Sequence, residues 1–193
     1  MRIEVMIIGV DLAGKEDNPT GVSILDKDKI DTLTIKTDSE LLEICKSNEP
    51  KVIAIDSPLS FPKNKKGLRK ADSELVSRGH KVLPPGFGGM RFLTERGIQL
   101  AKKLRKQNLK VIEVHPRTSG KILFNSSNRE DWIASLKKKE WDLNEDINEH
   151  EVDAILAALT GLLYLKGKVE KVGEEGEKII IPKKNLDFPE SFY

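Results

Sequence analysis

The sequence predicts an α/β protein with a mixed sheet, in which an antiparallel three-strand meander is followed by parallel strands, and with helices flanking the sheet. Three observations support this fold class. Short apolar segments joined by polar turns occupy the N-terminal part of the chain. Farther along, apolar segments alternate with helical patterns, as in parallel strands joined by crossovers. Near the C-terminal end, residues 148–165 show the helical period of a segment that packs against a sheet.

The N-terminal elements follow from apolar runs and turn residues. Residues 3–10 form a nearly unbroken apolar run, which is typical of a strand covered on both faces. A helix over residues 40–47, capped by Asp38 or Ser39, leads to another buried strand at residues 52–55. This order of strand, helix and strand implies a right-handed parallel crossover. Two short strands between the first strand and this helix cover residues 22–25 and 30–36.

The rest of the chain carries a basic insert and a long helix. Residues 57–110 lie between the fourth and fifth strands and are rich in Lys, Arg, Pro and Gly. One or two helices fill the stretch that ends at residue 140. The long helix begins at Asn148, which together with Glu151 resembles a capping box. The remaining elements are helices over residues 68–77 and 91–107 and strands over residues 111–114, 169–172 and 179–181.

Length and composition narrow the class of protein. The chain has 193 residues, which corresponds to about one domain, and 38% of them are hydrophobic, enough for a core. The lone Cys45 excludes an intramolecular disulfide and a cysteine-based zinc cage. The longest apolar run, residues 154–165, is shorter than the ~20 residues that span a membrane. We therefore expect a single domain over residues 1–193, with no membrane association and a cytoplasmic location.

Charge is distributed unevenly along the chain. The net charge of the whole sequence is +2, but residues 57–110 carry 14 basic and 3 acidic side chains, a net charge of +11. The segments before and after this insert have net charges of −5 and −4. An asymmetry of this size favours a surface that faces a polyanion such as nucleic acid. The alternative is a solvated basic helix face with no ligand.

Three carboxylates fall where apolar elements end or turn inward. Asp11 ends the first strand, Asp56 ends the fourth, and Asp153 lies in the first turns of the long helix. The carboxyl ends of neighbouring parallel strands meet at one edge of a sheet, and a helix that crosses this edge brings a third acid close. Such carboxylates repel one another unless a cation lies between them. Oxygen ligands of this kind favour Mg²⁺ or Mn²⁺, and we expect one of these ions as cofactor.

Each of these acids also has a simpler structural explanation. Asp56 could cap a turn, Asp11 could bond the loop at residues 18–20, and Asp153 could be a solvated helix residue. Two further side chains are weaker candidates for the same site. His150 shares a helix face with Asp153 and could ligate the metal or orient the attacking water, and Glu113, at the end of the fifth strand, is a fourth possible metal ligand.

A glycine-rich loop in the insert is a candidate phosphate site. Residues 84–91 read PPGFGGMR and open a helix, where backbone N–H groups and the helix N-terminus favour an anion. Arg91 and Arg96 could add bidentate contacts to phosphate, and Arg69 and Lys81 of the same insert complete the candidate phosphate ligands. The loop is not a P-loop, because GKS or GKT is missing at the required spacing. An ordinary glycine-rich turn with solvated arginines is the alternative.

These motifs carry two resemblances, one to the RNase H-like fold with its RuvC-type helix and one to a family that matches nearly the whole chain. The order of strands and helices, with acids on strands one and four and on a late helix, resembles the ribonuclease H-like fold. The segment HEVDAILAAL at residues 150–159 resembles the last metal-binding helix of RuvC-type Holliday-junction resolvases. Over nearly the whole chain, the sequence resembles an uncharacterised family of predicted RNase H-like nucleases. The motifs that carry this second resemblance are GVDLAG, NPTG, AIDSPLSFP, RKAD, LPPGFGGMRFLTERG, EVHPR, HEVDAILAALTGLLYLKG and IIIP.

The resemblance implies a two-metal hydrolase that cleaves the phosphodiester bonds of DNA or RNA. Asp11 would bridge both metals, Asp56 and Asp153 would hold one each, and His150 would assist. RNase H proper also places a Glu on the first helix. Here Glu40 and Glu43 lie on that helix, but neither matches a motif of the family.

Two other functions are compatible with the same sequence. Actin-like ATPases and phosphotransferases share the fold, but they use two such lobes with the nucleotide between them, and 193 residues hold one lobe. A homodimer could supply the second. A non-catalytic nucleic-acid-binding module that kept the basic surface is the other alternative. Dependence of activity on a metal ion separates this module from a nuclease.

Overall fold

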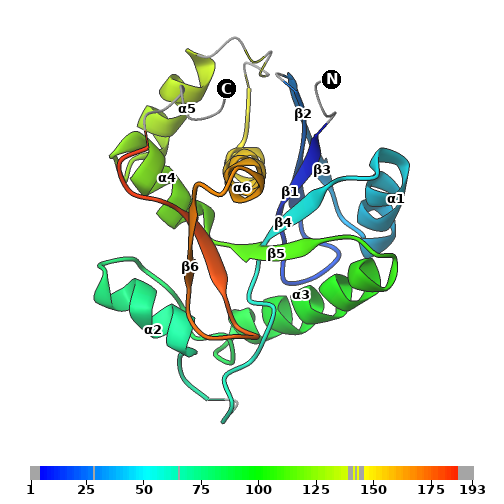
Figure 1. The fold of residues 1–193 in the computed structure, drawn as a ribbon. Coiled ribbons are helices and arrows are strands. Elements are labelled where there is room, and N and C mark those ends of the chain that lie inside the picture. Colours follow the sequence, from blue (N-terminus) through cyan, green and yellow to red (C-terminus); the bar gives the residue numbers. More distant parts are fainter. Residues whose placement is uncertain are drawn as a thin grey trace.

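The computed structural model describes residues 5–27, 29–64, 66–138, 141, 143 and 146–186, and its centre is a mixed sheet with helices on both faces (Figure 1). The strands are β1 (Met6–Asp11), β2 (Thr20–Asp26), β3 (Lys29–Ile35), β4 (Val52–Asp56), β5 (Val111–Val114), β6 (Val169–Val172) and β7 (Ile179–Pro182). The helices are α1 (Asp38–Asn48), α2 (Lys70–Ser77), α3 (Gly89–Lys106), α4 (Pro116–Phe124), α5 (Arg129–Lys137) and α6 (Glu149–Leu165).

The strand order confirms the predicted mixed sheet. The order is β3-β2-β1-β4-β5-β7-β6, with β1, β2 and β3 forming the antiparallel meander. Strands β4, β5 and β7 run parallel to β1, and β6 pairs antiparallel with β7. The C-terminal ends of β1 and β4 therefore meet at one end of the sheet, where the sequence analysis placed two of its acids.

Each face of the sheet has its own apolar core. Helices α4, α5 and α6 pack on one face, and α1 and α3 pack on the other (Figure 1). Helix α6 lies close to β1 and β2 because glycines face it. A Cβ at Gly9 would collide with the carbonyl oxygen of Ala154, and one at Gly21 would collide with that of His150. These two glycines set how near the acids on α6 come to the end of β1.

The helix caps show where sequence and structure differ. Helix α1 is capped by Thr37, not by Asp38 or Ser39 as predicted, because Thr37 Oγ1 accepts from the amide of Glu40 and Glu40 Oε2 accepts from the amide of Thr37. The predicted capping box of α6, from Asn148 and Glu151, is present. None of the described helices is long and apolar enough to cross a membrane.

Candidate active site

Asp11 and Asp56 lie side by side at the end of the sheet. They are direct partners in the parallel pairing of β1 and β4, and such partners on neighbouring strands are about 4.8 Å apart along the backbone. Residues two positions earlier, Gly9 and Ala54, face α6 or its core. Because side chains alternate along a strand, both carboxylates lie on the α6 face.

Asp153 joins them from the second turn of α6. Its side chain is 8% exposed, and one of its oxygens, Oδ1, is buried without a hydrogen-bond partner among the described residues. A buried carboxylate oxygen that accepts no hydrogen bond costs free energy, about 1–3 kcal/mol or more for a charged group. This oxygen therefore stays unsatisfied unless a cation or a hydrogen-bond donor reaches it.

The three acids disturb one another electrostatically. Burial raises the pKa of Asp56 well above its ordinary value, and the negative charges of Asp11, Asp153 and Glu113 raise it further. Burial also raises the pKa values of Asp11 and Asp153, although a neighbouring cationic or hydrogen-bonding group opposes the rise in each case. This clustering of carboxylates with raised pKa values is characteristic of functional sites.

Two side chains contact the acids of the cluster. His150 Nδ1 lies 2.7 Å from Asp11 Oδ2. Arg129, the first residue of α5, donates to Asp153 Oδ2 and also pairs with Glu149 at 3.0 Å. The sequence predicts His150 near this site but gives no sign of Arg129, because the residues around Arg129 carry no motif and only a weak helical pattern. Nothing in the local sequence distinguishes Arg129 from a solvated first-turn arginine.

The donor chemistry of this cluster suits a hard divalent cation. The three acids offer oxygen atoms alone, as Mg²⁺ and Mn²⁺ prefer, and the unpartnered Asp153 Oδ1 is an available ligand atom. As the side chains stand, no three His, Cys, Asp or Glu residues in the described part of the chain converge closely enough to hold a metal ion. Arg129 and His150 instead engage Asp153 and Asp11.

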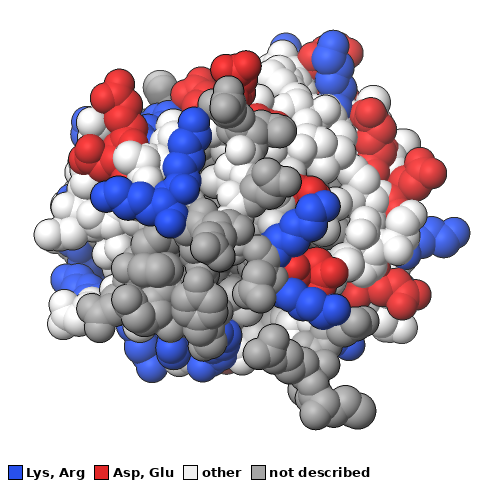
Figure 2. Space-filling model, turned by 90° about the horizontal axis from the view of Figure 1, so that it is seen from above, with Lys and Arg blue, Asp and Glu red and all other residues white. Residues whose placement is uncertain are grey.

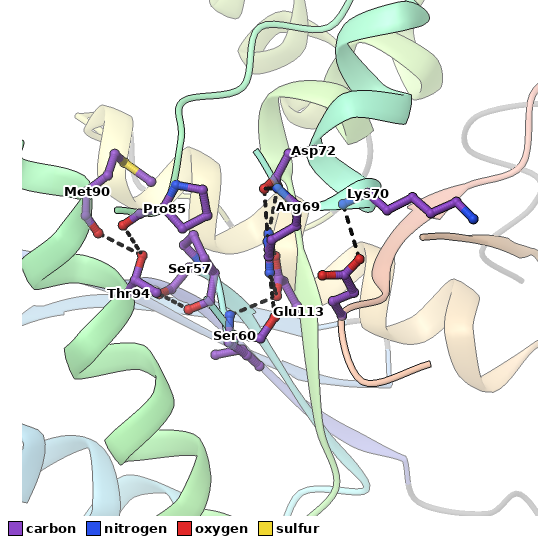
Figure 3. Close-up of polar contacts among 12 residues, drawn as sticks. Ser57, Ser60, Arg69, Lys70, Asp72, Pro85, Met90, Thr94 and Glu113 are labelled. Carbon is purple, nitrogen blue, oxygen red and sulfur yellow. Dashed lines mark hydrogen bonds and ion pairs between the residues drawn. The ribbon is translucent and has the colours of Figure 1, made fainter. Parts of the chain in front are cut away.

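Glu113 does not join the three acids on the α6 face, although its charge reaches Asp56. It pairs in register with Ile55 rather than with Asp56, so the alternation of side chains sends it to the other face of the sheet. There both of its oxygens accept from Arg69, at 2.6 and 2.9 Å, and one also accepts from the amide of Leu59 (Figure 3). Asp72 accepts from the same guanidinium, so Arg69, 2% exposed, lies between two acids.

The predicted phosphate ligands divide into buried and exposed side chains. Arg69 and Arg96 are buried. Arg96 donates to Asp38 and to the backbone carbonyls of Ala13 and Lys36, and these bonds connect α3 to the loop after β1 and to the segment between β3 and α1. Arg91 is exposed and pairs with Glu95 on its own helix. Lys81 is exposed and lines a cleft that reaches Asp56. Arg69 lines the same cleft, so Lys81 is the exposed one of the two predicted phosphate ligands that the structure brings near Asp56.

The surface charge is mixed on the face seen in Figure 2. Blue and red side chains are interspersed over its described part, without a large area of one sign. The basic insert, with α2 and α3, lies on the opposite side of the molecule, at the bottom of Figure 1.

In the glycine-rich loop, Gly88 adopts a positive φ as the residue before α3, and the Thr94 hydroxyl donates to the Pro85 carbonyl oxygen at 3.0 Å (Figure 3).

Sequence and structure comparisons fit this description. The chain belongs to the family described as protein of unknown function DUF429, which matches residues 9–178. A search of curated proteins gave no significant match. Among solved structures, Thermus thermophilus RuvC in complex with a Holliday junction substrate has a TM-score of 0.55 and 13% sequence identity, over 84% of this chain and 96% of that one. Thermus thermophilus RuvC alone gives a TM-score of 0.53 at the same identity and coverage.

These similarities confirm two predictions. The match over residues 9–178 confirms that the chain belongs to an uncharacterised family, and the likeness to RuvC confirms the RNase H-like fold. At 13% identity the likeness extends to the fold, and function has to be argued from the site.

Proposed function

We propose that this protein is a metal-dependent nuclease that hydrolyses phosphodiester bonds in nucleic acid. The observation that carries the proposal is the meeting of Asp11, Asp56 and Asp153 on one face of the sheet end, with raised pKa values and an unpartnered carboxylate oxygen. An RNase H-like fold with acids at the ends of β1 and β4 and on α6 is compatible with two-metal hydrolysis.

Asp11, Asp56 and Asp153 are the residues that would hold the metal ions, Mg²⁺ or Mn²⁺, with Asp11 between the other two. When bound, such ions lower the pKa of a water molecule to make it a nucleophile and stabilise charge on the leaving oxygen. His150 fixes the orientation of the Asp11 carboxylate through its 2.7 Å contact. Arg129 neutralises Asp153 in the structure described here and is placed to contact the substrate once that carboxylate binds a cation.

Nucleic acid is the proposed substrate class. RuvC, which shares the fold, has been solved with a Holliday junction, so a four-way DNA junction is one substrate to test. The cationic side chains near the acids suit a phosphodiester. A cytoplasmic location and a homodimer remain predictions. No specific feature of the site favours the actin-like phosphotransferase or the non-catalytic nucleic-acid-binding module.

The test is a cleavage assay on a panel of nucleic acids. Wild-type protein is incubated with single-stranded, duplex and four-way-junction DNA and with structured RNA, in Mg²⁺, in Mn²⁺ and in EDTA. We expect cleavage of at least one substrate in a divalent metal and none in EDTA. The variant Asp153→Asn keeps the shape of the side chain but removes a ligand charge, and we expect it to lower the rate at least 100-fold.

The matched control for this variant is Asp31→Asn, which changes an exposed acid on β3 that pairs with Lys29. It should cleave at the wild-type rate. Full activity of Asp153→Asn on the substrate that the wild type cleaves would contradict the assignment of the site, and wild-type protein that cleaves nothing in the panel would contradict the proposed function.

A further inference from the structure

A pocket beside the acids is lined by cations and no carboxylate. It has a volume of about 370 Å³ and lies where the start of α4, the start of α5 and the segment after α2 meet. Lys81, Arg117, Lys121 and Arg129 are the charged side chains of its wall. A volume of this size is within the range of ligand sites, ~300–1,000 Å³.

The pocket continues into the candidate active site. The neighbouring cleft, of about 720 Å³, reaches Asp56 and shares four lining residues with the pocket, His80, Lys81, His115 and Arg117. On the other side, Arg129 both lines the pocket and pairs with Asp153. A ligand in the pocket is therefore adjacent to the acids without displacing them.

Three cations of this pocket differ from the two buried arginines of the basic insert. Arg69 and Arg96 are saturated by internal partners. In contrast, the side chains of Lys81, Arg117 and Lys121 form no hydrogen bond or ion pair with any residue in the described ranges, and Arg117 acts on Asp56 and Asp153 through its charge alone. Three unpaired cations around one cavity repel one another, and a bound anion relieves that repulsion while forming charge-assisted hydrogen bonds.

The uncharged groups around the pocket also favour the binding of an anion. Helix α4 begins there without a side-chain cap and without an acid in its first turn, so its positive N-terminal end adds to the field. Burial and the charges of His80 and Arg117 lower the pKa of His115 to about 4. His115 is therefore uncharged at neutral pH, and its ring lies 2.8 Å from the Thr118 hydroxyl.

We propose that this pocket binds a phosphate group of the nucleic-acid strand, next to the phosphodiester that lies at Asp11, Asp56 and Asp153. Arg117 and Lys121 on α4 and Lys81 on the segment after α2 contact this phosphate. The inference rests on the proposed function and deepens it, because it assigns a second phosphate subsite outside the carboxylate cluster. Arg117, Lys121 and Arg129 lie outside the basic insert, in a segment where the distribution of charge along the sequence gives no sign of them.

The test measures binding in EDTA, so that it does not depend on metal or on cleavage. A fluorescent five-nucleotide single-stranded DNA is titrated with wild-type protein and with the double variant Arg117→Gln/Lys121→Gln across a salt series. Both side chains are exposed on α4, so the variant should fold, which thermal unfolding checks. We expect at least tenfold weaker binding and a slope of log K against log salt that is flatter by about 0.7, since the pocket holds one phosphate and each single-strand phosphate contact contributes ~0.7.

The control is Lys102→Gln/Lys106→Gln, which removes the same two charges from the exposed side of α3. It should bind as wild type does. Equal losses in both double variants, or no loss in the α4 variant, would overturn the pocket. A 5′-phosphorylated and an unphosphorylated oligonucleotide distinguish a terminal phosphate from an internal one. Loss of binding confined to the α4 variant supports the pocket even where the cleavage assay fails, so the two proposals are separable.

Discussion

Two groups of carboxylates lie near the ends of the central strands, on opposite faces of the sheet, and they have different partners. On the α3 face, Glu113 and Asp72 surround Arg69, whose guanidinium donates to all four of their oxygens. On the α6 face, His150 contacts Asp11 and Arg129 pairs with Asp153, and Asp153 Oδ1 is buried without a partner among the described residues.

The difference separates a structural cluster from a candidate functional one. In the Arg69 cluster every carboxylate oxygen accepts from a donor, so none is left without a partner. In the Asp11 cluster the acids exceed their counter-charges, and the pKa of Asp56 is raised. An excess of buried negative charge costs stability and is retained where a cation or substrate uses it.

The largest expected effect comes from breaking the structural cluster. Arg69→Met leaves Glu113 and Asp72 as uncompensated buried charges, and we expect a loss of about 3–5 kcal/mol in the free energy of unfolding. Urea denaturation measures it. The control Arg91→Met removes an exposed arginine on α3 that pairs with Glu95, and it should change stability little. A stable Arg69→Met protein would show that the cluster contributes nothing to the fold.

A smaller effect of opposite sign is expected in the Asp11 cluster. In EDTA at pH 7, Asp56→Asn removes a buried charge that its neighbours repel, and we expect a gain of about 1–3 kcal/mol. Because the pKa of Asp56 in the folded chain is raised above its ordinary 3.8, its favourable contribution is complete below about pH 4 and is lost as the pH rises through the folded pKa.

Wild-type stability should therefore fall with rising pH more steeply than that of Asp56→Asn, and thermal unfolding from pH 4 to 8 measures the difference. The control Asp17→Asn changes an exposed acid between β1 and β2 and should follow the wild type. Parallel stability curves for wild type and Asp56→Asn would contradict the excess of negative charge at this site.

The sequence carries enough information for most of the fold but less for the site. Apolar runs bounded by turn residues predict the strands, because a buried strand needs apolar side chains. The capping box of α6 is predicted as well, because it depends on two residues that are close in the sequence. The neighbourhood of Asp11 and Asp56 follows from strand topology. The position of Glu113 does not, because it depends on the pleat of β5, and a single position along a strand reverses the face.

The sequence also does not show which acids and carbonyls from distant elements pair with its cationic side chains. Arg69 and Arg96 belong to a strongly basic segment, yet they are saturated by acids and carbonyls from distant elements. Arg117, Lys121 and Arg129 lie in a segment with a net charge of −4, yet they line the cationic pocket. The net charge of a segment thus does not predict which of its cationic side chains lack an ion-pair partner, because the partners come from elements that are distant in the sequence.

The smallest expected effect sharpens the role of Arg129. Arg129→Gln removes the guanidinium from Asp153, and we expect a loss of about 1 kcal/mol in EDTA, since the arginine is partly exposed. The same change frees the Asp153 carboxylate, so Mn²⁺ should stabilise the variant more than it stabilises the wild type. Thermal unfolding with and without Mn²⁺ measures both quantities.

Arg78→Gln is the matched control, because Arg78 has a similar exposure and pairs with Glu170 away from the three acids. It should gain no more stability from Mn²⁺ than the wild type gains. If Mn²⁺ stabilises Arg129→Gln less than the wild type, Arg129 does not compete with a cation for Asp153.

The central claim is that Asp11, Asp56 and Asp153 together bind divalent metal, and anomalous X-ray scattering from crystals grown with Mn²⁺ tests it most directly. The account predicts anomalous peaks bounded by these three carboxylates, with Asp153 no longer paired with Arg129. Anomalous density that is missing there, while the Arg129–Asp153 ion pair persists at millimolar Mn²⁺, would contradict the claim.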